Sequence, residues 1–210
     1  MTLLFSNQPE GGVNEGERFW TRVPAAIDGP RLQAPTGRWK DGLCDCFSLG
    51  VCHPHVWCAL FCSKIAMAQV MMRMQLTWLG QPGPRTATKN TFWVVVTLFM
   101  SYIVYSTSLE IATAEYTPQT LPLPLLLAKT IGSVLFGLWS LLSLCQTRQS
   151  VRHQYSIPEE RCVGCEDICC SFFCTCCVVA QMSRHTGEYE TYPGTCCTQT
   201  GLPPNAPMTV

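Results

Sequence analysis

The chain has 210 residues, and its 14 Lys and Arg balance its 14 Asp and Glu, so its net charge is zero. Only 13% of the residues are charged, about half of the roughly 25% that is usual in soluble domains. With no basic surplus, the composition gives no reason to expect nucleic acid as a partner. The hydrophobic share of 47% is ordinary, so the information lies in how the apolar residues cluster.

Both ends of the chain are irregular in composition. Residues 1–38 are rich in Gly, Pro and polar side chains, which predicts a disordered N-terminal tail. This stretch has no basic region followed by an apolar one, so we do not interpret it as a secretory signal. Residues 186–210 predict an irregular, solvated C-terminal tail. Between the tails we expect one cysteine-rich domain over residues 39–185.

Two long apolar runs dominate the middle of this domain. No charged residue lies between Asn90 and Leu109, and the run from Leu123 to Cys145 is interrupted only by Lys129. Because about 20 apolar residues cross a bilayer as a helix, we predict transmembrane helices at about 91–110 and 123–146. The alternative is a buried hairpin in a soluble core, which two such closely spaced runs disfavour. The predicted fold is therefore an all-α membrane protein with a two-helix transmembrane hairpin and a lipid bilayer as partner.

The charges beside these runs predict an orientation. Basic residues flank the hairpin on its outer sides: Arg85, Lys89, Arg148 and Arg152. The connecting segment has Glu110 and Glu115 but neither Lys nor Arg. By the positive-inside rule, both termini should be cytosolic, and we expect the membrane to be the plasma membrane.

Small residues follow one face of each predicted span. They are Thr97, Ser101 and Ser108 in the first, and Ser133, Gly137 and Ser140 in the second. Such faces allow close helix packing, within the hairpin or between protomers; lining a pore is the alternative. Two spans cannot enclose a pore alone, so transport would require a homo-oligomer.

The chain has fifteen cysteines, and all but Cys145 flank the hairpin. Cytosolic thiols are kept reduced, so with this topology we expect metal ligands, acylation sites or buried apolar residues rather than disulfides. A weak repeat relates two cysteine blocks at one constant offset: Cys58, Cys62 and Gln69 match Cys170, Cys174 and Gln181. We predict that each block forms a continuous helix, from about His55 to Leu79 and from about Asp167 to His185, and that the two helices lie close together.

These blocks contain the candidate metal ligands. On a helix, Cys58 and Cys62 share a face, as do Cys170, Cys174 and Cys177. Two such faces could present four thiolates, which suit Zn²⁺ or Cd²⁺. Cys44 and Cys46, on either side of Asp45, complete the set of candidate ligands. The cofactor that we consider is a zinc ion, either structural or transported. The alternative is that these cysteines pack as small hydrophobic residues.

No catalytic motif is found, so we do not expect an enzyme. The pair Cys162 and Cys165 forms a CxxC motif, but no βαβ pattern surrounds it to suggest a redox domain. The four histidines are scattered.

The motifs together resemble the PLAC8 family of cysteine-rich membrane proteins. The resemblance rests on the segments 39–47 (WKDGLCDCF), 152–155 (RHQY) and 167–184 (DICCSFFCTCCVVAQMSR), together with Cys62 and Gln69. The family includes plant cadmium-resistance proteins, fruit-weight and cell-number regulators and placenta-specific gene 8 products. Two departures concern the metal ligands: Lys64 and Ala180 stand where the family usually has cysteine.

This resemblance implies roles in divalent-metal tolerance or efflux, in calcium influx or in limiting cell number. We therefore hypothesise a membrane protein that handles soft divalent cations (Zn²⁺ or Cd²⁺) as a homo-oligomer. The alternative hypothesis is a membrane-tethered regulatory scaffold whose cysteines are structural.

Overall fold

The computed structural model describes residues 34–45, 47, 50, 53–116, 122–159, 164–196, 198–204 and 206. This part of the chain consists of helices and irregular segments, and its only β pairing is one isolated bridge between Leu76 and Pro82. The all-α prediction is therefore confirmed for the described residues. Most of the predicted N-terminal tail lies outside them, as do Cys46, Cys52, Cys162 and Cys197.

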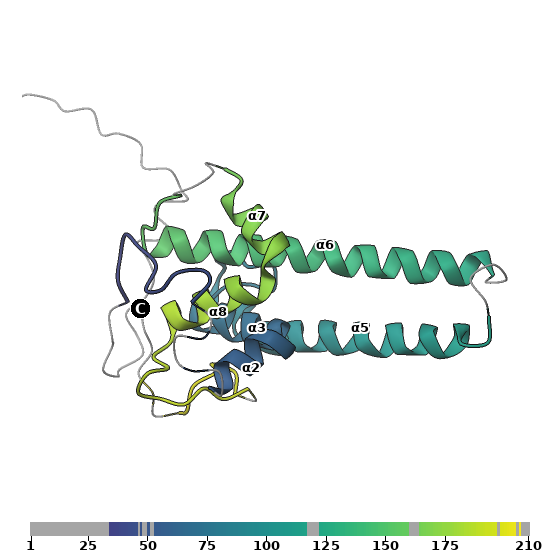
Figure 1. Ribbon diagram of the computed structural model, residues 1–210, viewed down its shortest axis with the longest axis horizontal. Coiled ribbons are helices and arrows are strands. Elements are labelled where there is room, and N and C mark those ends of the chain that lie inside the picture. Colours follow the sequence, from purple (N-terminus) through teal and green to yellow (C-terminus); the bar gives the residue numbers. More distant parts are fainter. Residues whose placement is uncertain are drawn as a thin grey trace, which may run out of the picture.

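Two long helices form a hairpin that projects from a helical head (Figure 1). Helix α5 (Thr91–Thr113) has 23 residues and helix α6 (Leu123–Gln154) has 32, or about 35 and 48 Å at 1.5 Å per residue. Both are long and apolar enough to cross a membrane, which confirms the predicted hairpin. Helix α6 extends well beyond its predicted end at residue 146, because its polar last turns are buried in the head.

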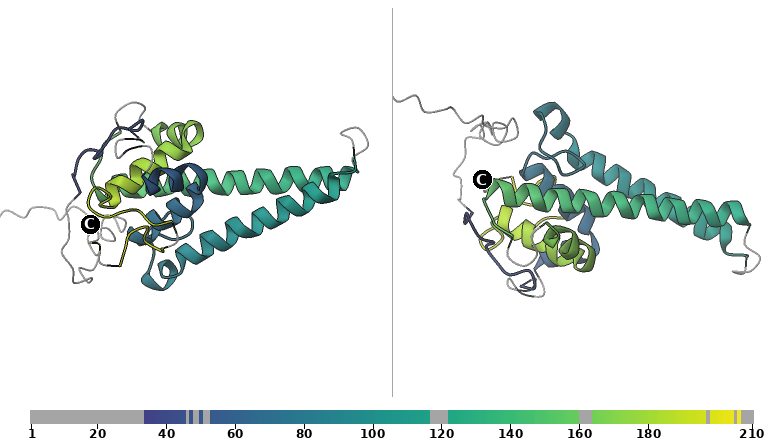
Figure 2. Two further views of the ribbon diagram at one scale, coloured as in Figure 1. Left: turned by 60° about the horizontal axis from the view of Figure 1, so that its bottom comes forward. Right: turned by 90° about the horizontal axis from the view of Figure 1, so that it is seen from above.

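Aromatic side chains join the two helices along the hairpin. Tyr102 and Phe136 stack with their ring centroids 3.9 Å apart, and the Tyr105 hydroxyl donates to the Ala128 carbonyl at 2.6 Å. A Cβ at Gly132 would collide with the Tyr105 ring, whereas a Cβ at Gly137 would meet nothing within 4 Å. Gly137 therefore faces away from α5. The predicted small-residue face of α6 is only partly used within the hairpin, and Figure 2 shows the two helices approaching each other toward their connected ends.

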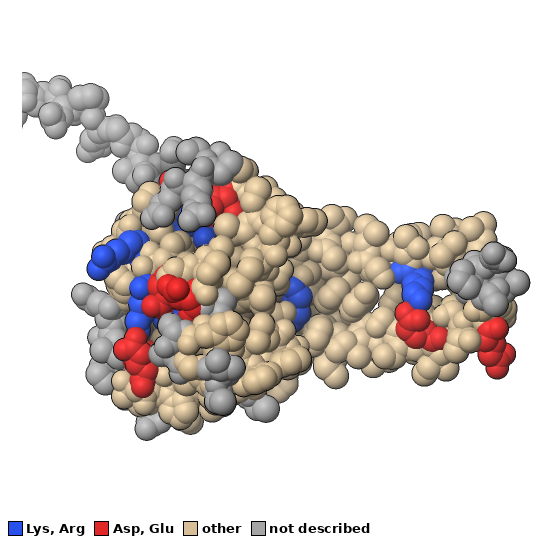
Figure 3. Space-filling view, in the orientation of Figure 1, with Lys and Arg blue, Asp and Glu red and all other residues tan. Residues whose placement is uncertain are grey.

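Charged side chains gather at the two ends of the molecule (Figure 3). In the outer part of the hairpin, short of its tip, Lys129 and Glu110 form an ion pair at 2.7 Å, and further charges cover the head. The view in Figure 3 shows an uncharged band of the hairpin between this ion pair and the head. This distribution fits a membrane protein whose hairpin lies in the apolar layer.

The head is built from two sharply bent helix pairs. Helices α2 (Pro54–Phe61) and α3 (Ser63–Arg73) meet at 111°, and α7 (Glu166–Phe173) and α8 (Thr175–Thr186) meet at 114°. The prediction of one continuous helix per cysteine block was wrong. Helix α3 packs against both α5 and α8, while α2 turns back to contact α8, and a straight helix could not make both sets of contacts.

The two cysteine blocks do lie close together, as predicted, because α3 packs against α8. The interface is made by fully buried apolar side chains, among them Met67, Val70, Met71, Val178 and Met182. A short helix, α4 (Arg85–Thr88), precedes α5. The head thus has a hydrophobic core, which also takes in Phe92 and Leu144 at the base of the hairpin.

A buried guanidinium joins four parts of the head. Arg148 of α6 is 2% exposed and bonds Asp167 of α7 at 3.0 Å and Gln181 of α8 at 2.7 Å. Its guanidinium also lies 4.7 Å from the centre of the Trp39 ring, a cation–π contact. Asp167 also bonds Arg152 at 2.7 Å, so one carboxylate bridges the two buried cations. Glu166 pairs with Arg148 at 3.5 Å and Glu159 with Arg152 at 3.1 Å.

The C-terminal segment is irregular, as predicted, but its described part is packed on the head rather than solvated. The Gln69 amide donates to the backbone carbonyls of Thr195 and Thr198 at 3.0 and 2.9 Å. Tyr189 and Leu202 are 5% and 3% exposed. These contacts correct the expectation of a solvated tail.

Candidate metal-binding thiol cluster

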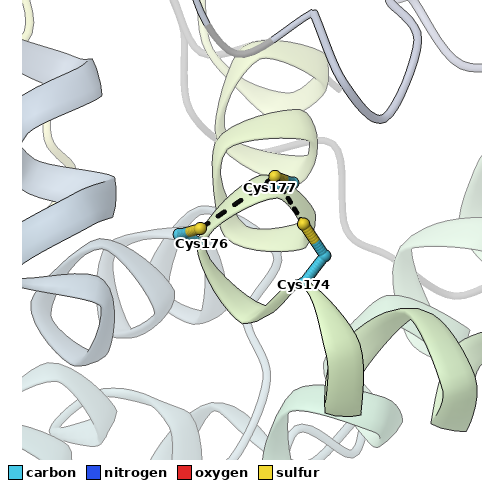
Figure 4. A group of neighbouring side chains, drawn as sticks. All are labelled: Cys174, Cys176 and Cys177. Atoms are coloured by element: carbon cyan, nitrogen blue, oxygen red, sulfur yellow. Dashed lines mark hydrogen bonds between the residues drawn. The ribbon is translucent and has the colours of Figure 1, made fainter.

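Three cysteines lie together where α7 ends and α8 begins. Cys174 is the residue at the bend, and Cys176 and Cys177 are in the first turn of α8. The Sγ atoms of Cys174 and Cys177 are 2.6 Å apart, and those of Cys176 and Cys177 are 4.0 Å apart. Figure 4 shows the three side chains along this first turn. Among the described residues, they are the only group of three His, Cys, Asp or Glu whose ligand atoms lie within 4.8 Å of one another.

The surroundings of the cluster favour negative charge. The first turn of α8 contains no acidic residue, and a helix N-terminus carries a partial positive charge from its unpaired N–H groups. Metal binding needs thiolates rather than thiols. All three side chains are half-buried, so an ion could reach them from solvent while being partly shielded from it.

The spacing of the sulfur atoms is close to that of a metal site but not identical to it. Tetrahedral Zn²⁺ binds thiolates at about 2.3 Å, which places ligand sulfurs about 3.8 Å apart. The Cys176–Cys177 separation of 4.0 Å fits this geometry. The 2.6 Å separation of Cys174 and Cys177 is shorter, so a bound ion would require the Cys174 side chain to move away by about 1 Å.

The other candidate ligands are dispersed. Cys58 is buried in the core at 5% exposure, while Cys62 and Cys170 are partly buried against it. Burial raises the pKa of the Cys170 thiol, which favours the protonated form that does not bind metal. Cys44 is exposed, and Cys46 lies outside the described residues. The four-thiolate arrangement across both blocks is therefore not present as a cluster in the described part of the chain.

The sequence interpretation missed Cys176. On a continuous helix, Cys176 would point away from the face that Cys170, Cys174 and Cys177 share. The bend changes this relationship, because Cys174 stands before the first turn of α8 instead of within a longer helix. The C-x-C-C spacing itself was the available clue.

The corresponding corner of the first block has no such cluster. Cys62 ends α2 and precedes α3 as Cys174 ends α7 and precedes α8. Lys64 and Ile65 stand two and three residues after Cys62, as Cys176 and Cys177 stand after Cys174. They therefore take the places of these two cysteines. The Lys64 ammonium contacts the Ser140 hydroxyl of α6, and burial lowers its pKa to about 8. A cation in this position disfavours a bound metal ion, so only the second block is suited to one.

Cys165 is the exception to the expectation of reduced thiols. It forms a disulfide bond, and its partner lies outside the described residues. Cys169, Cys174 and Cys176 are free thiols, so the candidate cluster is separate from this disulfide.

The sequence model described as the PLAC8 family matches residues 39–185 of the chain. This match includes the hairpin, both bent helix pairs and the thiol cluster. No curated protein and no solved structure matches the chain.

Proposed function

The chain belongs to the PLAC8 family, and we propose that it handles soft divalent cations, Zn²⁺ or Cd²⁺, at the thiol cluster of Cys174, Cys176 and Cys177. The single observation that carries this proposal is the convergence of three thiols at the start of α8. Thiolates are the ligands that these cations prefer.

The composition of the cluster favours transient over structural binding. Structural zinc sites are closed by four protein ligands, whereas sites that keep an open position exchange a water or a substrate. Three thiols leave one position open in a tetrahedral site. An ion held in this way could be accepted and released, which is what tolerance or efflux requires.

The position of the cluster relative to α6 supports a role at the membrane. Thr175, next to Cys174 and Cys176, lines a groove with Leu138 and Leu141 of α6, in the apolar part of that helix. Two spans cannot enclose a pore, so passage of an ion across the membrane would need a homo-oligomer. Gly137, where α6 presents open space, would allow the close approach of a second copy.

Metal tolerance in a metal-sensitive host tests this function. Cys174→Ser and Cys176→Ser should reduce tolerance to Cd²⁺ or Zn²⁺, because each removes one of three thiolates. Cys169→Ser is the matched control, since Cys169 is an exposed free thiol in the same helix pair but outside the cluster. Cys58→Ser should have a smaller effect, because Cys58 is buried in the core and lies outside the cluster.

The abundance of each variant in the membrane has to be measured beside tolerance, because an unstable variant would mimic lost binding. If Cys174→Ser and Cys176→Ser remain abundant and tolerance is unchanged, the metal proposal fails. The regulatory scaffold would then be the better hypothesis. The buried Cys58 and the disulfide-bonded Cys165 are the observations in its favour, because both are structural uses of cysteine.

A further inference from the structure

We propose that α2 and α7 lie in the surface of the lipid leaflet next to the head, with their apolar faces among the lipid chains. The partner of these two faces is thus the membrane itself. This role is separate from metal binding, because the residues concerned are aromatic and aliphatic and lie outside the thiol cluster.

Large apolar side chains are exposed along one side of both helices. In α7, Phe172 and Phe173 are 68% and 81% exposed, and in α2, Phe61 is 73% exposed. Trp57, Leu60 and Ile168 add to the same faces. Exposed apolar patches of this kind mark a surface that binds a protein or a membrane.

The opposite sides of both helices are fixed in the head. In α7, Asp167 is ion-paired with Arg148 and Arg152, and Ser171 is 1% exposed. In α2, Val56 and Ala59 are each 2% exposed. Neither helix can rotate to bury its aromatic side chains without breaking these contacts. The exposed faces are therefore permanent features of the folded chain.

Both bends lie at the depth where α6 leaves the apolar layer. Phe172 and Thr175 line a groove with Val134 and Leu141 of α6. Lys64, beside the other bend, contacts Ser140. Residues 123–142 of α6 would span about 30 Å, the thickness of the hydrocarbon core. The bends are therefore level with the boundary of that core.

Each bent pair is long and apolar enough for a broken span only when its two helices are counted together, and two features argue against such a span. Helices α2 and α7 have 8 residues each, or about 12 Å, which is too short to span the hydrocarbon core. Their continuations α3 and α8 bury polar groups in the head: Arg184 pairs with Asp41 at 2.9 Å, and Arg73 bonds Tyr189 at 2.9 Å. Both contacts are made to residues of the head, which holds α3 and α8 there.

The exposed faces of α2 and α7 are most simply covered by lipid, because the face of α7 is continuous with the apolar surface of the hairpin. The exposed apolar surface of α6 passes directly into Phe172 across the groove that they share. Amphipathic helices with Trp and Phe on one face bind in this way at the boundary between headgroups and chains. A second copy of the chain would need to cover two separate helices on the head and is the rival outcome.

Site-specific photo-crosslinking in vesicles tests the proposal. The full chain is reconstituted in phosphatidylcholine vesicles with a photoreactive phenylalanine analogue at Phe61 or at Phe173, which changes shape little. The same analogue at Val104, 61% exposed on α5, is the positive control for lipid contact. At Glu190, whose side chain is 60% exposed on the head, it is the negative control.

Mass spectrometry should find phospholipid adducts at positions 61 and 173 with yields within about threefold of that at position 104, and none at position 190. Crosslinks that join two chains at positions 61 and 173 would overturn the proposal in favour of a protein interface. The absence of lipid adducts there, with position 104 labelled, would overturn it as well.

Discussion

Cys62 and Cys174 occupy equivalent positions in the two halves of the head: each ends one short helix and precedes the next at a bend of more than 110°. The residues that follow differ, with Lys64 and Ile65 after the first and Cys176 and Cys177 after the second. One local structure therefore presents a cation in one half and a thiol cluster in the other. This difference is the basis for assigning metal binding to the second block alone.

The buried ion network should dominate the stability of the head. Asp167→Asn removes the carboxylate that bridges Arg148 and Arg152, and Arg148 is 2% exposed. Breaking a buried pair while one charge remains inside costs about 3–5 kcal/mol. Because Glu166 and Glu159 still pair with the two arginines, we expect a loss of about 3 kcal/mol, the lower end of this range, in the free energy of unfolding. Denaturant titration in detergent measures it.

The matched control for this prediction is Glu110→Gln. Glu110 pairs with Lys129, but their side chains are 63% and 41% exposed, and pairs of this kind contribute about 0–1 kcal/mol. If the two variants lose the same stability, the Arg148 network is not the dominant contribution.

Much of this fold follows from the sequence, because the hairpin and the helical repeat are local patterns. Two long uncharged apolar runs predict α5 and α6 directly. The bends are different, since neither Cys62 nor Cys174 is a Gly or Pro and the apolar periodicity continues across both. They arise from tertiary contacts of α3 and α8. The packed segment around Tyr189 likewise has no periodic pattern and is held by side chains such as Gln69, distant in sequence.

The candidate site could be predicted only in part, because local sequence patterns do not record tertiary contacts. Cys174 and Cys177 follow from helical spacing, whereas Cys176 joins them only because the helix restarts at residue 175. The burial of Cys58 in the core also depends on long-range packing that no local motif encodes.

Acidification should destabilise the head between about pH 6.5 and pH 4. Burial lowers the pKa of both His55 and His185 to about 4. In the unfolded chain these histidines take up a proton near pH 6.5, so the unfolded state binds more protons in this window. The stability is fully present above pH 6.5 and falls as the pH drops toward 4, by about 1.4 kcal/mol per pH unit for each histidine.

The pH dependence of unfolding measures this contribution. His185→Gln should flatten the profile in that window, because His185 is 1% exposed and its Nδ1 accepts from the Lys40 N–H. The exposed His153, replaced by Gln, should leave the slope unchanged. A slope that survives His185→Gln would assign the acid sensitivity to other groups.

Both termini should be accessible from the cytosol and not from outside. The hairpin places the residues before α5 and after α6 on the same side, and the basic Arg85, Lys89, Arg148 and Arg152 indicate that this side is cytosolic. Small tags at each terminus, probed with antibody in intact and permeabilised cells, check this orientation. A tag that antibody reaches in intact cells would reverse it.

The most direct test of the central claim is a Cd²⁺ titration of the reduced, purified full chain, followed by the ultraviolet absorbance of the thiolate–cadmium bond. We expect one tightly bound Cd²⁺ per chain, retained in Cys169→Ser. In Cys174→Ser, Cys176→Ser and Cys177→Ser, loss of one of three ligands should weaken binding by about tenfold or more. Undiminished binding in all three variants, or no binding to the fully reduced wild-type chain, would contradict the assignment of Cys174, Cys176 and Cys177 as a metal site.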